Sequence, residues 1–123
     1  MWNINKTGGN MKKPIPLAEI NFNDKNLIPV VVQDSVNKQV LMVAWMDQDA
    51  LKLTVKTGEA YFWSRSRKTL WHKGQTSGNF MFVEKILVDC DADTLLLKVK
   101  PAGPACHTGE VSCFYRNLEL DYA

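Results

Sequence analysis

Asp89-Cys90-Asp91-Ala92-Asp93-Thr94 is the stretch around which the rest of the sequence is organised. A long apolar run, Phe80–Val88, precedes it, and Leu95–Lys100 follows it. In the second segment Leu95, Leu97 and Val99 alternate with Leu96, Lys98 and Lys100. A bounded apolar run and an alternating segment are both typical of β-strands. We therefore expect two strands that flank an acidic segment with a single thiol.

The acidic segment offers ligands for two kinds of metal ion. Carboxylate oxygens suit Mg²⁺, Ca²⁺ or Mn²⁺, whereas the thiolate of Cys90 suits zinc. The three carboxylates belong to Asp89, Asp91 and Asp93, which we call the acidic triad. In an extended segment these three side chains share one face, and Cys90 points to the other. An EF-hand is excluded, because Thr94 and Lys100 stand where such a loop needs Gly and Glu. The alternative to a cation site is a solvated acidic strand end.

The remaining two of the three thiols follow at Cys106 and Cys113. Their spacing matches no zinc-finger pattern. Free cysteines often serve as small buried apolar residues, so a role in packing is the alternative to a metal site. Both nevertheless lie beside a Gly- and Pro-rich segment, and three protein ligands leave the open fourth position that a catalytic zinc needs. His107 directly follows one of these thiols, which makes it a candidate for proton transfer.

The upstream half predicts the remaining elements. Pro29–Gln33 and Val40–Trp45 flank a turn-prone segment and predict a β-hairpin. A helix is expected to begin after Asp47, a preferred N-cap residue, and to end at Gly58. With a further strand over Cys113–Leu120, the balance of five or six strands to one main helix predicts a β-rich α+β fold, a small single domain with a mixed sheet.

A polar and basic segment, Ser64–Asn79, follows the strand-like Tyr61–Trp63 and is expected to be a long loop, which in a compact domain is usually functional. Its guanidinium, ammonium and hydroxyl groups, with glycines that admit backbone N–H groups, can bind phosphate. The candidate substrate-binding residues are Trp63, Ser64, Arg65, Ser66, Arg67, Lys73, Gly74, Thr76 and Ser77, and His72 is a second candidate catalytic residue. Aromatic residues among cations also suit single-stranded nucleic acid, and a solvated loop is the plainer alternative.

Composition narrows the class of protein. The 123 residues carry a net charge of +2 and 46% hydrophobic residues, which gives no sign of a nucleic-acid binder. No apolar run is long enough to span a membrane, and residues 1–13 lack the apolar core of a signal peptide. We expect a flexible leader over residues 1–13 and one domain over residues 14–123. Three cysteines, an odd number, favour a reducing compartment and hence the cytoplasm.

Taken together, these stretches resemble the phosphoribosyl-AMP cyclohydrolase family of histidine biosynthesis. The resemblance runs from about Leu27 to Arg116 and is carried by dispersed matches in order: Pro29–Asp34, Val40–Met46, Thr57-Gly58, Phe62–Arg67, Leu70-Trp71, Lys73-Gly74, Thr76–Asn79, Asp89–Asp93, Gly103–Gly109 and Ser112–Tyr115. Two departures stand out. Gln75 replaces the usual Glu, which puts a charge-dependent role there in doubt, and Met81 replaces a common Gln.

The resemblance implies an enzyme, its metals and its assembly. It implies zinc held by Cys90, Cys106 and Cys113, magnesium near the acidic triad, and an intertwined homodimer whose zinc ligands come from both subunits. The implied reaction opens the N1–C6 bond of the adenine ring of 1-(5-phosphoribosyl)-AMP by a zinc-activated water and gives the formimino-imidazole carboxamide ribotide. Because the chain stops at Ala123, a single-activity form is expected rather than one fused to a pyrophosphatase domain.

Two other functions compete. A zinc deaminase acting on a purine nucleotide would carry a His-x-Glu and a Pro-Cys-x-x-Cys signature, and this sequence has neither. A single-stranded nucleic-acid-binding module would bind with an affinity that falls steeply with salt. That function leaves the three cysteines and the acidic triad without a role.

Overall fold

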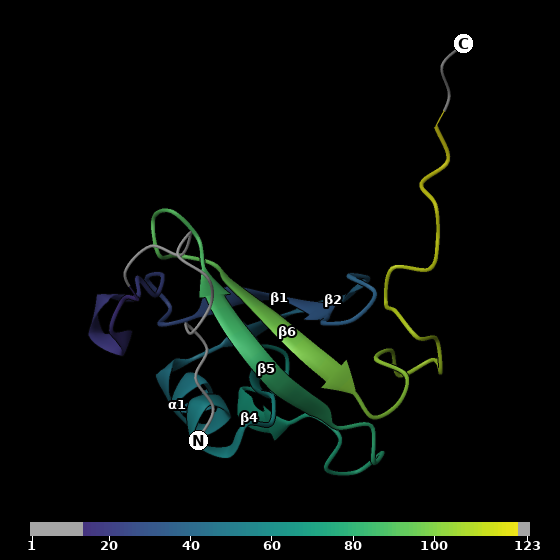
Figure 1. Ribbon diagram of the computed structural model, residues 1–123, viewed down its shortest axis with the longest axis horizontal. Coiled ribbons are helices and arrows are strands. Elements are labelled where there is room, and N and C mark those ends of the chain that lie inside the picture. The colour runs from purple at the N-terminus through teal and green to yellow at the C-terminus, as the bar shows by residue number, and fades with distance from the viewer. Residues whose placement is uncertain (1–13, 121–123) are drawn as a thin grey trace.

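The computed structural model describes residues 14–120, so the leader predicted over residues 1–13 lies outside the described residues. In chain order the elements are the 3-10 turn η1 (Leu17–Glu19), β1 (Ile28–Asp34), β2 (Val40–Met46), α1 (Gln48–Thr57), β3 (Tyr61–Ser64), β4 (Thr69–His72), β5 (Met81–Val88) and β6 (Leu95–Pro101) (Figure 1). The described part of the chain thus contains six strands and one α-helix. The predicted β-rich α+β domain is confirmed.

Four strands form a mixed sheet in the order β2-β1-β6-β5. The predicted hairpin is confirmed, because β1 and β2 pair antiparallel around residues 35–39. β5 and β6 form a second antiparallel hairpin, and β6 also runs parallel to β1, with Val31 opposite Leu96. The acidic segment is therefore the connection between β5 and β6, at one end of the sheet.

Helix α1 follows β2 directly, and both of its predicted ends are confirmed. The Asp47 carboxylate accepts a hydrogen bond from the Ala50 N–H at 2.8 Å, which satisfies a free donor of the first turn. Gly58 ends the helix in the left-handed conformation with φ 77°. The buried Thr54 hydroxyl donates to the Ala50 carbonyl at 2.8 Å and accepts from the Tyr61 N–H at 3.0 Å, so the helix is tied to β3.

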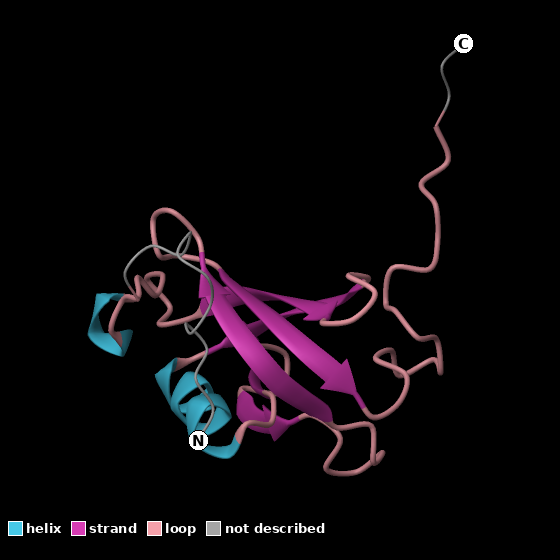
Figure 2. Ribbon diagram, in the orientation of Figure 1, coloured by secondary structure: helices cyan, strands magenta, loops and turns pink. Residues whose placement is uncertain are grey.

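The core lies on one face of the four-stranded sheet. Helix α1 and the two-stranded sheet β3-β4 cover that face (Figure 2). Alternate side chains of the four strands pack against this layer and form the core. The buried residues include Val30, Val32, Leu41, Phe62, Met81, Ile86, Leu95, Leu97 and Val99. Burial of this apolar surface at about 25 cal/mol per Å² is the main force that holds the layers together.

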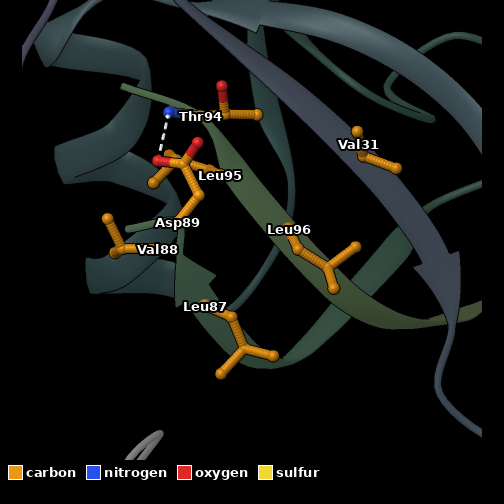
Figure 3. A pocket seen from close by; sticks show the side chains of 7 residues that line it. All are labelled: Val31, Leu87, Val88, Asp89, Thr94, Leu95 and Leu96. Carbon is orange, nitrogen blue, oxygen red and sulfur yellow. Dashed lines mark hydrogen bonds between the residues drawn. The ribbon is translucent and has the colours of Figure 1, made fainter. Parts of the chain in front are cut away.

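The opposite face of the sheet carries an open apolar patch near the connection between β5 and β6, whereas Lys98 and Lys100 lie further along β6. Val43 is 49% exposed, and Val31, Leu87 and Leu96 are half-buried. A depression of about 390 Å³ lies on this face, lined by Val31, Leu87, Val88, Asp89, Thr94, Leu95 and Leu96 (Figure 3). None of the helices in residues 14–120 is long and apolar enough to cross a membrane.

Two predicted segments differ from the structure. Ser64–Asn79 is not one long loop, because Thr69–His72 forms β4 and pairs with β3 across a tight turn. Its Leu70, Trp71 and His72 supply a strand that the surrounding polar residues conceal in the sequence. The strand predicted over Cys113–Leu120 is also wrong: after the Cys113 N–H bonds the Leu41 carbonyl at 2.7 Å, the chain leaves the body of the molecule without a neighbouring strand (Figure 1).

Candidate active site

The acidic triad is gathered by a turn rather than by an extended segment, so the prediction of an extended conformation is wrong. Asp89 accepts hydrogen bonds through Oδ1 from the Asp93 N–H at 3.0 Å and the Thr94 N–H at 3.2 Å. Ala92 adopts a positive φ of 61°, which reverses the chain. The turn nevertheless brings one carboxylate oxygen from each of the three aspartates within 4.8 Å of the others. Such a group could hold a metal ion.

The electrostatics of the triad agree with a site for a cation. Loss of hydration raises the pKa of Asp89, but hydrogen bonds from the Asp93 and Thr94 backbone outweigh it and leave the pKa below its ordinary value. The neighbouring Asp91 and Asp89 raise the pKa of Asp93. Three carboxylates at this spacing repel one another, and either a proton or a divalent cation relieves the repulsion.

The second cluster is a thiol pair, Cys106 and Cys113, beyond the other end of β6. A tight loop presents Cys106, whose N–H bonds the Glu110 carbonyl at 3.2 Å and whose carbonyl accepts from the Gly109 N–H at 3.0 Å. The Ser112 hydroxyl bonds the Val40 carbonyl at 2.8 Å and thereby anchors Cys113 to strand β2. Each thiol influences the pKa of the other, and both are free of disulfide bonds.

The members of the thiol pair are held in different electrostatic states. A hydrogen bond of 3.0 Å from the Thr108 hydroxyl holds the pKa of the Cys106 thiol below its ordinary value. Burial raises the pKa of the Cys113 thiol, and the neighbouring Cys106 adds to the rise. A thiolate is the form that binds a metal, so Cys106 is the better prepared ligand. Soft sulfur donors of this kind fit zinc.

Lys73 lies beside the thiol pair. Its ammonium is buried and donates to the Ala105 carbonyl at 3.0 Å, directly before Cys106. The Gly74 backbone has φ +94°, and a Cβ there would overlap the Phe80 backbone, so only glycine fits this turn. Both residues were predicted to belong to a phosphate-binding loop, and no feature of the sequence indicates that Lys73 contacts the loop of the thiol pair.

The third predicted zinc ligand, Cys90, is exposed in the connection between β5 and β6. The thiol pair follows the far end of β6, and a strand of seven residues spans roughly 20 Å at about 3.3 Å per residue. Among residues 14–120 the acidic triad is the one group of three potential metal ligands that comes together. One chain therefore does not gather the three cysteines.

The predicted substrate-binding residues fall into two turns. Arg65, Ser66 and Arg67 form the connection between β3 and β4, where Ser64 Oγ accepts from the Arg67 N–H at 3.3 Å. The Arg65 guanidinium lies over the Trp45 ring at 4.6 Å. A second turn holds the others, Lys73, Gly74, Thr76 and Ser77, while Trp63 is half-buried in β3. The exposed guanidinium and hydroxyl groups remain open to an anionic ligand.

The two histidines have different surroundings. His72 stacks on Tyr61 with ring centroids 4.2 Å apart, and its Nε2 lies 2.9 Å from Glu59 Oε1. His107 is exposed in the same loop as Cys106. Two partners were not predicted from the sequence: Glu59, which contacts His72, and Thr108, which contacts Cys106. The second could have been found, because a hydroxyl two residues from a thiol can reach it.

A β-rich domain with a thiol pair at one end of a strand and a carboxylate cluster at the other belongs to the class of candidate metal-dependent enzymes. Comparison with known proteins makes the assignment specific. The family model for phosphoribosyl-AMP cyclohydrolase matches residues 42–115, which is more than half of the chain and includes the triad and all three thiols. The chain belongs to the phosphoribosyl-AMP cyclohydrolase family, a family of hydrolases, and the resemblance inferred from the motifs is confirmed.

Individual relatives agree. The chain is 69% identical over 91 residues to a phosphoribosyl-AMP cyclohydrolase of Lacticaseibacillus paracasei, covering 74% of this chain and 83% of that protein. It is 57% identical over 103 residues to one of Archaeoglobus fulgidus, covering 84% and 95%. It is 56% identical over 105 residues to a histidine biosynthesis bifunctional protein of Caldanaerobacter subterraneus, covering 85% and 51%. Neither the deaminase nor the nucleic-acid-binding alternative is favoured by these matches.

Proposed function

We propose that this protein hydrolyses the N1–C6 bond of the adenine ring of 1-(5-phosphoribosyl)-AMP in histidine biosynthesis. The observation that carries the proposal is the family match over residues 42–115, which spans the thiol pair, the acidic triad and the basic turns together. The reaction adds water at C6, breaks the N1–C6 bond and delivers a proton to N1. Because N1 bears a ribosyl group, the ring amidine is cationic when protonated, and C6 is correspondingly electrophilic.

Cys90, Cys106 and Cys113 are proposed to hold zinc. The donor set fits this metal, since thiolates are soft ligands and Thr108 favours the thiolate of Cys106. These three cysteines would hold the ion, which would supply a water molecule of lowered pKa as the nucleophile that this hydrolysis needs at neutral pH.

The zinc site is proposed to be shared by the two subunits of an intertwined homodimer, with Cys90 from one and the thiol pair from the other. Three observations support this. Cys90 and the thiol pair stand at opposite ends of β6. The open face of the sheet carries an apolar patch beside the acidic segment. The chain after Cys113 extends away from its own body (Figure 1), and Phe114, Leu118 and Leu120 are exposed. A second copy would cover this apolar surface.

The acidic triad is proposed to bind Mg²⁺, and the basic turns to bind the substrate phosphates. Mg²⁺ typically takes one or two carboxylates and completes its coordination with water and phosphate oxygens. The guanidinium groups of Arg65 and Arg67 can bind phosphate oxygens in pairs, and the hydroxyls of Ser64, Ser66, Thr76 and Ser77 can donate to them. These groups account for a local concentration of positive charge in a chain of net charge +2.

His107 is proposed to transfer the proton in this reaction. It is exposed and directly follows Cys106, a proposed zinc ligand, and histidine is the side chain that most often transfers protons in catalysis. His72 is the weaker candidate, because its Nε2 is engaged with Glu59. A His107→Ala variant with full activity would contradict the assignment.

A reducing, cytoplasmic location is proposed as well. All three cysteines lie within the described residues and all are free thiols. Free thiols that serve as metal ligands persist where the compartment is reducing.

The test is the ring opening of phosphoribosyl-AMP by purified protein, followed by the change in absorbance, before and after removal of zinc with a tight chelator. We expect turnover that disappears with the metal and returns with added zinc in the presence of Mg²⁺. No turnover from protein that is zinc-loaded, dimeric and supplied with Mg²⁺ would overturn the proposal. Salt-dependent binding to single-stranded oligonucleotides would then support the alternative.

A further inference from the structure

Lys73 is a buried cation, and its surroundings differ from those of a phosphate-binding lysine. Lys73 is 7% exposed, and a lysine is almost never buried unless its charge is paired with another group. Its backbone N–H bonds the Ala60 carbonyl at 3.1 Å, at the end of the small sheet, and the ammonium lies 5.6 Å from the centre of the Trp71 ring. The side chain thus points from β4 across the core edge toward the loop after β6.

The ammonium acts on the backbone of the thiol loop. It donates to the Ala105 carbonyl at 3.0 Å, and this contact joins residues that are far apart in the sequence. Ala105 precedes Cys106 and is itself buried, so the hydrogen bond fixes the loop where it begins. The loop is closed on its other side by the Ala105 N–H, which bonds the Val111 carbonyl at 3.1 Å.

The hydrogen bond to Ala105 brings the charge of Lys73 near the thiol pair, which begins at the next residue. Burial lowers the pKa of Lys73, and the Cys113 and Cys106 thiolates counteract this by raising it. The two ion pairs recorded in residues 14–120 join His72 to Glu59 and Lys100 to Glu84, so neither involves Lys73. A buried charge without an opposite charge is costly, and the thiols are placed to supply one.

We propose that Lys73 is a positioning residue of the thiol site: it holds Cys106 in place through Ala105 and balances the excess negative charge of three thiolates on one divalent cation. The sum of three thiolates and Zn²⁺ is one negative charge, and a neighbouring ammonium neutralises it. The inference rests on the proposed zinc site. It assigns the charge of Lys73 to the metal rather than to a substrate phosphate.

Two substitutions test the role of the ammonium. Lys73→Met keeps most of the length of the side chain and removes both the charge and the donor to Ala105, whereas Lys73→Arg keeps the charge and a donor. Lys52→Met, on the exposed surface of α1, is the matched control for loss of a lysine charge. Each variant is assayed for zinc affinity by competition with a chromogenic zinc chelator and for stability of the zinc-free protein by urea unfolding.

We expect Lys73→Met to weaken zinc binding about 10–100-fold, the loss typical of groups that support metal ligands. Lys73→Arg should retain most of the affinity, and Lys52→Met should retain all of it. Wild-type zinc affinity in Lys73→Met together with a raised KM would overturn the inference in favour of phosphate binding. A further outcome is that both variants lose zinc affinity equally and in proportion to their loss of stability. That result would overturn the inference in favour of a purely structural role.

The same measurement distinguishes failure of the inference from failure of the proposed function. If the unmodified protein binds no zinc, the proposed zinc site is wrong and the inference falls with it. If the unmodified protein binds zinc and Lys73→Met binds it equally well, the inference alone is wrong.

Discussion

The two ends of strand β6 are built in opposite ways. At its start, the acidic triad depends on contacts between residues that are close in the sequence. The three aspartates lie within five consecutive residues, and the Asp93 and Thr94 N–H groups donate to Asp89 and fold the turn. At its end, the thiol pair depends on distant parts of the chain: Lys73 from the second turn, Leu41 from β2, and the loop after Pro101. A local cluster needs only its own turn, whereas the thiol pair needs the whole fold.

The difference also explains the place of Cys90. It is part of the local acidic turn, and the fold carries that turn to the end of the sheet opposite the other two thiols. The proposed zinc site with three thiolates would therefore draw its ligands from two chains. Substitutions at each end of β6 should then have separable effects, and the following predictions test that separation from the largest expected effect to the smallest.

Cys106→Ala should have the largest effect. It removes the better prepared thiolate, so zinc affinity should fall by more than about 100-fold, beyond the loss caused by supporting groups, and ring-opening activity should fall below detection. Zinc content after dialysis and the rate of ring opening measure both. Retention of stoichiometric zinc would show that this thiol is not a ligand.

Gly74→Ala should destabilise the thiol end strongly. The added Cβ meets the Phe80 backbone, and φ +94° disfavours any L side chain, so we expect a loss of about 2–4 kcal/mol in the free energy of unfolding. Gly78→Ala is the control: φ is +80°, but the space around its Cβ is open, so about 1 kcal/mol is expected. Urea unfolding compares the two, and equal losses would contradict the close contact at Gly74.

Asp89→Asn should affect the acidic end. The amide oxygen can still accept the hydrogen bonds from Asp93 and Thr94, so the turn should persist while one metal-binding charge is lost. We expect the Mg²⁺ concentration for half-maximal activity to rise about tenfold, since Mg²⁺ binds through very few carboxylates. Asp24→Asn, an exposed residue before β1, is the control. An unchanged Mg²⁺ requirement would remove the triad from the site.

Thr108→Val should have the smallest effect. Loss of the hydroxyl removes the hydrogen bond that lowers the pKa of Cys106, so the pKa should rise toward its ordinary value. Less thiolate is then present at neutral pH, and zinc affinity should fall by up to about tenfold, with the deficit shrinking as the pH rises above both pKa values. Thr108→Ser should behave as the unmodified protein. Alkylation of Cys106 in zinc-free protein, followed by mass spectrometry across pH, measures the shift directly.

Local features of this fold were predictable from the sequence. The N-cap at Asp47 and the C-cap at Gly58 depend on residue types that satisfy helix ends, and the structure has both. The hairpin of β1 and β2 follows from two apolar runs around a turn. Each of these depends on interactions between residues that are close in the sequence.

The features that the sequence concealed depend on contacts between distant segments. Strand β4 has no fully buried residue, and its pairing with β3 gives it a conformation that its polar neighbours do not indicate. The opposite error concerns Cys113–Leu120, where apolar residues suggest a strand but the single chain offers no neighbour to pair with. The contact between Lys73 and Ala105 arises only when β4 and the loop after β6 meet.

The proposed sharing of the zinc site between subunits is tested most directly by mixing Cys90→Ala with Cys106→Ala protein under conditions that allow subunit exchange. Each variant alone lacks a ligand in both sites. A mixed dimer combines Cys90 of one chain with the thiol pair of the other, so random exchange should restore about a quarter of the unmodified activity. A mixture of Cys90→Ala with Cys90→Ser is the control and should stay inactive. No recovery in dimers shown to have exchanged, or activity in Cys90→Ala alone, would contradict the shared site.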